Sequence, residues 1–268
     1  MAMYRDLMKR ATTPTTVTAP NRTGRPASPR TGTQLQAVTA KASAEPTLDH
    51  VDTNAAIVFV DMSGYTALTE IHGDHVAAQF AEDFAGMAGE ALGPGDELIK
   101  TMGDAVMVAS ADAPAALAFL RRLGVAARRA EGFPMLRAGV SAGTVVRRRG
   151  DVFGTIVNAA ARLAALAAPG RIVFGRDVAA AAADLGLPVE ALGLVGIRNM
   201  ANRMELFAVD IGEEHQQHVD PVCRLHVTAA SAAITRSRGD RTYRFCSAAC
   251  ADRFDTLARS ARDSSVAE

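Results

Sequence analysis

The sequence lacks several features that would each point to a particular class of protein. Lysine plus arginine equals aspartate plus glutamate at 29 each, so no net charge favours nucleic acid or an anionic membrane. No apolar run approaches the roughly 18–20 residues that a membrane-spanning helix needs. The N-terminal residues also lack the apolar stretch of a secretory signal. We therefore expect a cytoplasmic protein that binds neither nucleic acid nor a membrane.

Cysteine is scarce, and so are acids near the N-terminus. The 3 cysteines all follow position 220, and this odd count argues against a disulfide framework. No acid lies between Asp6 and Glu45, in a stretch rich in Thr, Ser, Pro and Ala. Such a stretch buries too little apolar surface to fold, so we predict that residues 1–50 form a disordered basic tail. An organellar transit peptide is the alternative, because it would share this composition.

The central part of the chain shows alternating strand and helix patterns. Residues 55–60 form a continuous apolar run, which is typical of a strand buried on both faces. Residues 96–110 predict two strands around a Gly-Asp turn. We expect further strands at 136–146, 171–175 and 204–209, and helices at 63–92 with a break near Gly73, 113–130, 156–167 and 178–186. This order predicts an α+β fold, a mixed sheet covered by helices, over residues 51–211.

A second, smaller unit follows the central domain. Residues 212–218 are a polar linker, residues 219–260 form the small unit, and residues 261–268 are expected to be disordered. About 40 residues are too few to rely on a hydrophobic core alone. The three cysteines of this unit are therefore of interest.

Two acids stand at the ends of predicted strands. Asp61 ends the first strand, and Asp104 occupies the turn of the hairpin. Two carboxylates held together repel each other unless a cation lies between them, and oxygen ligands suit Mg²⁺ or Mn²⁺. The amides of residues 63–65 at the following helix start would offer donors to phosphate, with Gly64 allowing close approach. Taken singly, each acid has an ordinary alternative as a helix cap or a turn residue.

Three segments together resemble a known family. They are FVDMSGYTAL, IKTMGDAVMV and GDVFGTIVNAAARLA, and in this order and spacing they resemble the catalytic domain of class III purine nucleotide cyclases. The resemblance covers roughly residues 54–210. It implies a ferredoxin-like sheet, a dimeric enzyme and conversion of a purine nucleoside triphosphate to a cyclic nucleotide.

The resemblance assigns roles to the two acids and to a base-binding pair. Asp61 and Asp104 would hold two Mg²⁺ or Mn²⁺ ions, and the carbonyl of Met62 would add a ligand. Lys100 and Asp151 match the adenine-recognising lysine and its acidic partner. A lysine can donate to ring N1 of adenine, and a carboxylate can accept from its 6-amino group. Guanine would place an N–H opposite the lysine donor and a carbonyl opposite the carboxylate acceptor, so neither could form a hydrogen bond. ATP is therefore the expected substrate.

Further residues match the family's phosphate-binding positions. Asn158 and Arg162 are four apart and share one face of a helix. In the family this pair orients the ribose and stabilises charge on the α-phosphate, a role that suits the guanidinium fork. Ser63, Gly64 and Tyr65 are the expected phosphate-binding amides. Near the end of the catalytic domain the family has a lysine that binds the terminal phosphates. Arg198 occupies this position here, and Arg203 is the alternative candidate.

The family's active sites are shared between two subunits. Asp61 and Asp104 would come from one subunit, and Lys100, Asp151 and the helical pair from the other, so that a homodimer carries two sites. The alternatives are a guanylate cyclase or a silent cyclase-like dimerisation module. A polymerase-like palm or a diguanylate cyclase would need a Gly-Gly acid motif where this hairpin has Met-Gly-Asp. The sequence also lacks the Gly-x4-Gly-Lys loop of P-loop ATPases.

The cysteines of the small unit suggest a second metal site. Cys246 and Cys250 are four apart, so on a helix both thiolates face one way, and Cys223 precedes them. Thiolates favour Zn²⁺ or Cu⁺, and His226 is a candidate fourth ligand. The pattern of residues 219–260 resembles the YHS domain, a module associated with heavy-metal binding, which suggests a cyclase tuned by metal or redox state. Packing of buried cysteines as small hydrophobes is the alternative.

Overall fold

The structure is a computed structural model that describes residues 51–197, 202–211, 218–228 and 231–265, with side chains described as far as residue 258. The predicted basic tail, most of the predicted linker and Arg198 lie outside these residues. No helix among the described residues has the length and apolar character needed to cross a membrane.

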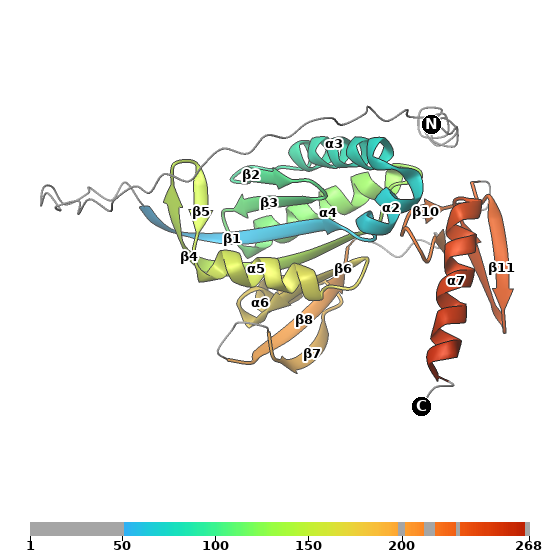
Figure 1. Cartoon of the computed structure of the whole chain (residues 1–268). Coiled ribbons are helices and arrows are strands. Elements are labelled where there is room, and N and C mark those ends of the chain that lie inside the picture. The colour runs from blue at the N-terminus through green and yellow to red at the C-terminus, as the bar shows by residue number, and fades with distance from the viewer. Residues whose placement is uncertain (1–50, 198–201, 212–217, 229–230, 266–268) are drawn as a thin grey trace, which may run out of the picture.

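A mixed sheet forms the centre of the larger domain, as predicted (Figure 1). Its strand order is β2-β3-β1-β4-β6-β8-β7, with β5 paired to β4 beside this path. β4 and β6 run parallel, and the other neighbours run antiparallel. The strands are β1 (Val51–Met62), β2 (Glu97–Met102), β3 (Ala105–Ser110), β4 (Leu136–Arg148), β5 (Asp151–Phe153), β6 (Arg171–Gly175), β7 (Glu190–Val195) and β8 (Met204–Asp210).

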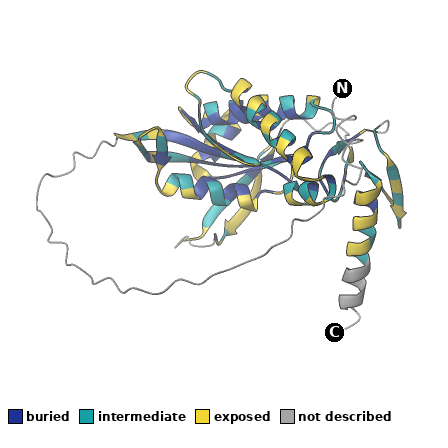
Figure 2. Cartoon of the chain, turned by 45° about the horizontal axis from the view of Figure 1, so that its top comes forward, coloured by how far each residue is buried: buried dark blue, intermediate teal, exposed yellow. Residues whose placement is uncertain are grey.

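Helices cover both faces of this sheet. They are α2 (Tyr65–His72), α3 (Asp74–Glu90), α4 (Ala113–Arg129), α5 (Thr155–Leu166) and α6 (Arg176–Asp184). Alternate residues of β1 enter different cores: Val58 and Val60 pack with α3 and α4, while Ile57 packs in the cluster under α5. This explains why the β1 run is continuously apolar, and the dark blue centre of the sheet in Figure 2 shows the burial.

Helix α5 lies unusually close to β4 because Gly139 has no side chain. A Cβ atom at this position would lie 2.1 Å from the amide nitrogen of Ala164 and 2.3 Å from the carbonyl oxygen of Ala160. Both of these are backbone atoms of α5, so neither can rotate away. Gly139 therefore sets the distance between this helix and the sheet.

The helix break at Gly73 is present as expected, with the glycine at φ 86° between α2 and α3. Other features differ from the sequence-based expectation, and the first is the short strand β5, which was not predicted. Strand β7 was not expected, because five of its six residues are exposed and give no pattern of buried positions. Helix α7 (Ala248–Ser265) also continues beyond residue 260, where we had placed the end of the small unit.

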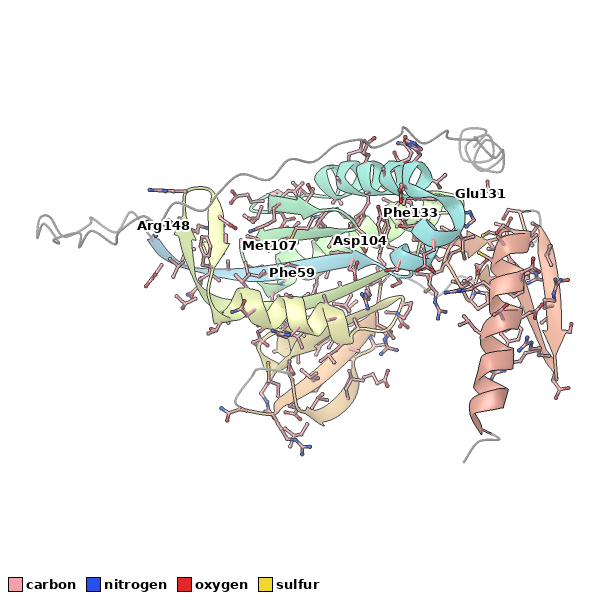
Figure 3. All side chains as sticks on the ribbon, viewed as in Figure 1. Phe59, Asp104, Met107, Glu131, Phe133 and Arg148 are labelled. Carbon is pink, nitrogen blue, oxygen red and sulfur yellow. The ribbon has the colours of Figure 1, made fainter. Side chains whose placement is uncertain are left out.

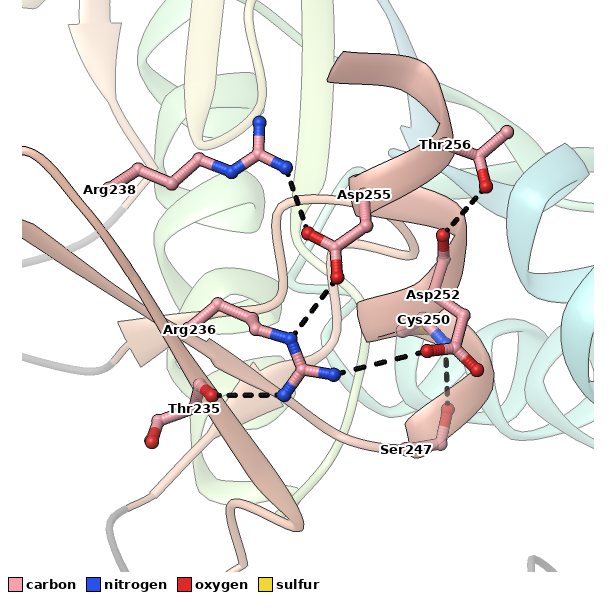
Figure 4. A network of polar contacts seen from close by, with 8 residues as sticks. All are labelled: Thr235, Arg236, Arg238, Ser247, Cys250, Asp252, Asp255 and Thr256. Atoms are coloured by element: carbon pink, nitrogen blue, oxygen red, sulfur yellow. Dashed lines mark hydrogen bonds and ion pairs between the residues drawn. The ribbon is translucent and has the colours of Figure 1, made fainter. Parts of the chain in front are cut away.

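The C-terminal unit consists of two short hairpins and α7. The hairpins pair β9 (His218–Val219) with β10 (His226–Val227) and β11 (Ile234–Arg238) with β12 (Arg241–Phe245). The β11–β12 hairpin is tied to α7 by ion pairs from Arg236 and Arg238 to Asp255, at 3.2 and 2.8 Å (Figure 4). These contacts orient the helix that carries Cys250.

This unit shares a core with the cyclase-like domain. Leu225 and Phe245 belong to the same buried cluster as Phe133 and Leu136 of the larger domain. A backbone hydrogen bond also connects the two units: the amide of Met135, just before β4, donates to the carbonyl of Arg224 at 3.0 Å. A unit too small to build its own core thus completes one by packing on its neighbour.

Candidate active site

Asp61 and Asp104 meet at one end of the sheet. Asp61 lies near the end of β1, opposite Ala105 of β3, and Asp104 occupies the adjacent β2–β3 turn (Figure 3). The two segments are joined because the amide of Met62 donates to the Asp104 carbonyl at 3.0 Å. Burial raises the pKa of Asp61 above its ordinary value, and the neighbouring Asp104 carboxyl adds to this rise. The predicted convergence of the two acids is therefore present in a single chain.

Arg137 is a member of this site that the sequence analysis missed. Its Nε donates to Asp61 Oδ2 at 2.7 Å, and its Nη2 donates to the same oxygen. Arg137 stands directly opposite Asp61 in the antiparallel register of β1 and β4. The guanidinium opposes the rise in the Asp61 pKa and balances its charge. A divalent cation between the two acids would compete with this arginine for Asp61.

The turn between β1 and α2 only partly fits the phosphate-binding role that we expected. The amide of Ser63 donates to the carbonyl of Met135 at 2.7 Å, so it is already used and does not serve as a phosphate donor. Gly64 precedes α2 with φ 79°, a left-handed conformation that suits glycine, and Tyr65 begins the helix. Partial burial raises the pKa of Tyr65, and the charge of Asp104 contributes. The amides of Gly64 and Tyr65 thus remain the candidates beside the acids.

Lys100 and Asp151 form an ion pair. Lys100 Nζ lies 2.7 Å from Asp151 Oδ2, and the two side chains are 38% and 33% exposed. The hydrogen bond from Lys100 holds the pKa of Asp151 below its ordinary value. Lys100 lies opposite Met107 in the β2–β3 register, and Met107 lies opposite Phe59 in the β1–β3 register. Asp61 follows Phe59 by two residues, so Lys100 and Asp61 occupy the same face of the sheet, which packs under α5. The pair is therefore formed within one chain and reachable from solvent.

Asn158 and Arg162 form no hydrogen bond or ion pair with these groups among the described residues. Both are on α5, where Asn158 is exposed and Arg162 is half-buried. Within the described part of the chain, neither side chain forms a hydrogen bond. The predicted site residues therefore fall into three sets: Asp61 with Asp104, Lys100 with Asp151, and the α5 pair.

The three cysteines gather around a histidine of the larger domain. Cys223, Cys246, Cys250 and His72 place their ligand atoms within 4.8 Å of one another. His72 ends helix α2 and is buried. Our candidate fourth ligand, His226, is not a member of this cluster. No local pattern points to His72, because about 150 residues separate it from Cys223.

Asp220 holds the cysteine loops in place. Its Oδ1 accepts from the amide of Val222 at 2.8 Å and from that of Cys223 at 3.3 Å, and its Oδ2 accepts from the amide of Cys246 at 2.9 Å. The side chain is fully buried, and burial raises the pKa of this carboxyl. The acid of the Asp-Pro-Val-Cys segment thus connects two loops that each carry a cysteine.

Comparison with known proteins places this architecture in a family. The model of the adenylate and guanylate cyclase catalytic domain matches residues 49–211, and the chain belongs to that family. The crystal structure of an adenylate/guanylate cyclase/hydrolase from Silicibacter pomeroyi superimposes with a TM-score of 0.52 at 27% identity, covering 60% of this chain and 98% of that one. The adenylyl cyclase CyaB of P. aeruginosa shares the fold with a TM-score of 0.52 at 18% identity, over 63% of this chain and 98% of that one.

Curated relatives in sequence are named adenylate cyclases. A pH-sensitive adenylate cyclase of Mycobacterium tuberculosis is 33% identical over 160 residues, which is 58% of this chain and 40% of the relative. An adenylate cyclase of Streptomyces griseus is 39% identical over 118 residues, which is 44% of this chain and 30% of the relative. The matched region thus spans well under half the length of these relatives.

Proposed function

We propose that the protein is an adenylate cyclase that converts ATP to 3′,5′-cyclic AMP and pyrophosphate. The observation that carries this proposal is the convergence of Asp61 and Asp104 at the end of the sheet, beside the β1–α2 turn. The named relatives support the same activity through their similarity over the catalytic domain. In the reaction the ribose 3′-oxygen forms a bond to the α-phosphorus and releases its proton. The bond to the bridging oxygen breaks, and its electron pair leaves with pyrophosphate.

The acid pair fits a site for hard divalent cations. Burial raises the pKa of Asp61 and the nearby Asp104 carboxyl adds to this rise, so a cation between the two groups would relieve their repulsion. Asp61, Asp104 and the Met62 carbonyl would supply oxygen ligands for two Mg²⁺ or Mn²⁺ ions. When bound, these ions would lower the pKa of the ribose hydroxyl and neutralise charge on the triphosphate. Gly64 and Tyr65 would present amides to the phosphates at the start of α2.

Lys100 and Asp151 would select the base. Their mutual contact holds donor and acceptor next to each other, matching ring N1 and the 6-amino group of adenine. Guanine would place a carbonyl opposite Asp151 and an N–H opposite Lys100, leaving polar groups unpaired. A site built to pair a polar group rejects the mismatched analogue strongly. ATP is therefore the proposed substrate, and a preference for GTP would refute this part.

The active enzyme would be a homodimer with two shared sites. Asn158 and Arg162 make no side-chain hydrogen bond within the described chain, which leaves them available to a nucleotide held by the acids of a partner subunit. Asn158 would orient the ribose, and Arg162 would stabilise charge on the α-phosphate in the transition state. Arg198, outside the described residues, remains the proposed contact for the terminal phosphates.

The test is cyclisation of ATP and GTP by the purified full chain with Mn²⁺. We expect cyclic AMP from ATP, and loss of product in Asp104→Asn. Asp184→Asn is the matched control, because Asp184 is exposed at the end of α6, and this variant should keep full activity. An active Asp104→Asn enzyme would refute the role of the acid pair.

Mixing two inactive variants tests the shared site. Asp61→Ala and Asn158→Ala should each be inactive alone, because each homodimer carries two defective sites. A mixed dimer has one site with both natural residues, so an equimolar mixture should recover at most about a quarter of the wild-type rate. No recovery, despite heterodimers detected by mass spectrometry, would place both residues in the same subunit's site.

A further inference from the structure

We propose that His72, Cys223, Cys246 and Cys250 hold one structural Zn²⁺ ion that joins the C-terminal unit to helix α2 of the cyclase domain. Three ligands come from the C-terminal unit, two of them in or beside α7, and the fourth comes from the last residue of α2. The site therefore belongs to neither unit alone.

The spacing of the four ligand atoms fits a tetrahedral zinc ion. Zinc binds sulfur at about 2.3 Å and imidazole nitrogen at about 2.0–2.1 Å, so a tetrahedron places two sulfurs ~3.8 Å apart and sulfur and nitrogen ~3.5 Å apart. The Cys223–Cys246 and Cys246–Cys250 sulfur distances are 3.5 and 3.6 Å. His72 Nε2 lies 3.5 Å from the Cys246 sulfur and 3.9 Å from that of Cys250. All six pairs of ligand atoms lie within 4.8 Å, so shifts of at most about 1 Å would complete the site.

The chemistry of the donor set favours zinc held permanently over a catalytic metal. Three thiolates with one imidazole are soft to borderline ligands, which exclude Mg²⁺ and Ca²⁺ and suit Zn²⁺. All four positions of a tetrahedron are filled by protein, so none stays open for water or substrate, as in structural zinc sites. His72, Cys223 and Cys250 are buried, which protects the bound ion from exchange.

Asp220 supplies the supporting hydrogen bonds that such a site needs. Its carboxylate accepts from the amides of Cys223 and Cys246, and so fixes the two loops that present these thiols. Groups that orient metal ligands in this way typically change metal affinity 10–100-fold when removed. Asp220 would be a positioning residue, since its hydrogen bonds to the backbone amides fix the loops that carry the ligands.

The bound ion would fix the helix that starts beside the proposed cyclase site. Helix α2 runs from Tyr65 to His72, so the zinc lies on the order of 10 Å from the turn at Gly64. The C-terminal unit contacts this turn directly, because a Cβ atom on Gly64 would lie 3.0 Å from the carbonyl oxygen of Cys223. Zinc loss is therefore expected to loosen the β1–α2 turn and lower cyclase activity, a consequence that rests on the proposed function.

The first experiment uses the wild-type full chain alone. Elemental analysis should find one zinc per chain, and X-ray absorption at the zinc edge should find three sulfur neighbours near 2.3 Å and one nitrogen near 2.0–2.1 Å. A chain without zinc, or a shell with fewer than three sulfurs or without nitrogen, would overturn the proposal. Neither measurement depends on the folding of a variant.

A matched pair of histidine variants then tests the link to α2. His72→Gln should lose zinc at least ten times more readily to a competing chelator, whereas His75→Gln, three residues away and exposed, should match the wild type. Equal zinc retention in both variants would refute the role of His72. Asp104→Asn separates this proposal from the cyclase function, because it should be inactive while retaining one zinc per chain.

Discussion

Replacing Gly139 by alanine should displace α5 and with it the proposed transition-state residues. The new methyl group would lie 2.1 and 2.3 Å from backbone atoms of α5, whereas ordinary contacts begin near 3.4 Å. The helix must therefore retreat by about 1 Å, because its backbone has no rotamer to change. Overpacking of this kind costs about 1–3 kcal/mol, and the upper end is expected here.

The substitution should lower both the stability and the activity. A domain of this size loses about 2–4 °C in Tm per kcal/mol, so we expect a Tm lower by about 6–12 °C. A displacement of about 1 Å at a reacting group costs on the order of 100-fold in rate, and α5 carries both Asn158 and Arg162. The assay is cyclic AMP formation, measured well below the new Tm, alongside a thermal melt.

Gly89→Ala provides the control for this substitution. Gly89 lies within α3 and a Cβ there meets nothing within 4 Å, so the change should stabilise the chain by about 0.5–1 kcal/mol without altering the rate. If Gly139→Ala kept both the Tm and the rate of the wild type, α5 would not lie against β4 as described. Gly139 would then not control the position of Asn158 and Arg162.

Three further predictions concern charged groups. Arg137→Gln should lower stability by about 1–3 kcal/mol, because it leaves Asp61 without its charged partner. Mg²⁺ should raise the Tm of this variant more than that of the wild type, because Arg137 no longer competes with the cation for Asp61. An equal effect of Mg²⁺ on both proteins would argue against this competition. Lys100 lowers the pKa of Asp151, so their contact contributes stability at pH values above the ordinary Asp pKa of about 3.9. This contribution is lost as the pH falls through the lower pKa of the folded state. An NMR titration of the Asp151 carboxyl with a pKa at or above about 3.9 would contradict the contact. Asp220→Asn should weaken zinc retention 10–100-fold, measured by chelator competition, and unchanged retention would remove its positioning role.

The sequence could predict the meeting of Asp61 and Asp104 because strand ends and a hairpin turn constrain where side chains emerge. It could not predict Arg137, because only the register between β1 and β4 puts this residue opposite Asp61. For a related reason the sequence could not show that the amide of Ser63 donates to the carbonyl of Met135, a partner more than 70 residues away. Local patterns identify elements, whereas contacts between distant elements decide which polar groups remain available.

The same limit explains the cysteine cluster. Spacing predicted Cys246 and Cys250 on one helical face, but Cys246 lies just before α7, which begins at Ala248, and only Cys250 is in the helix. The chain segment around Cys223 suggested a third ligand. The nearby His226 was the natural candidate for the fourth position, yet the structure supplies His72 from another domain. A ligand contributed across a domain boundary leaves no local trace in the sequence.

The joint core of the two units has a consequence for how such proteins can be recombined. A graft of residues 218–258 onto another member of the family would carry Leu225 and Phe245 but not the surface that receives them. The recipient would also need a glycine at the turn before α2, or the transplanted loop would collide with a side chain, and the proposed zinc site would need a histidine at the end of that helix. Evolution could therefore have exchanged this appendage only together with changes in its host.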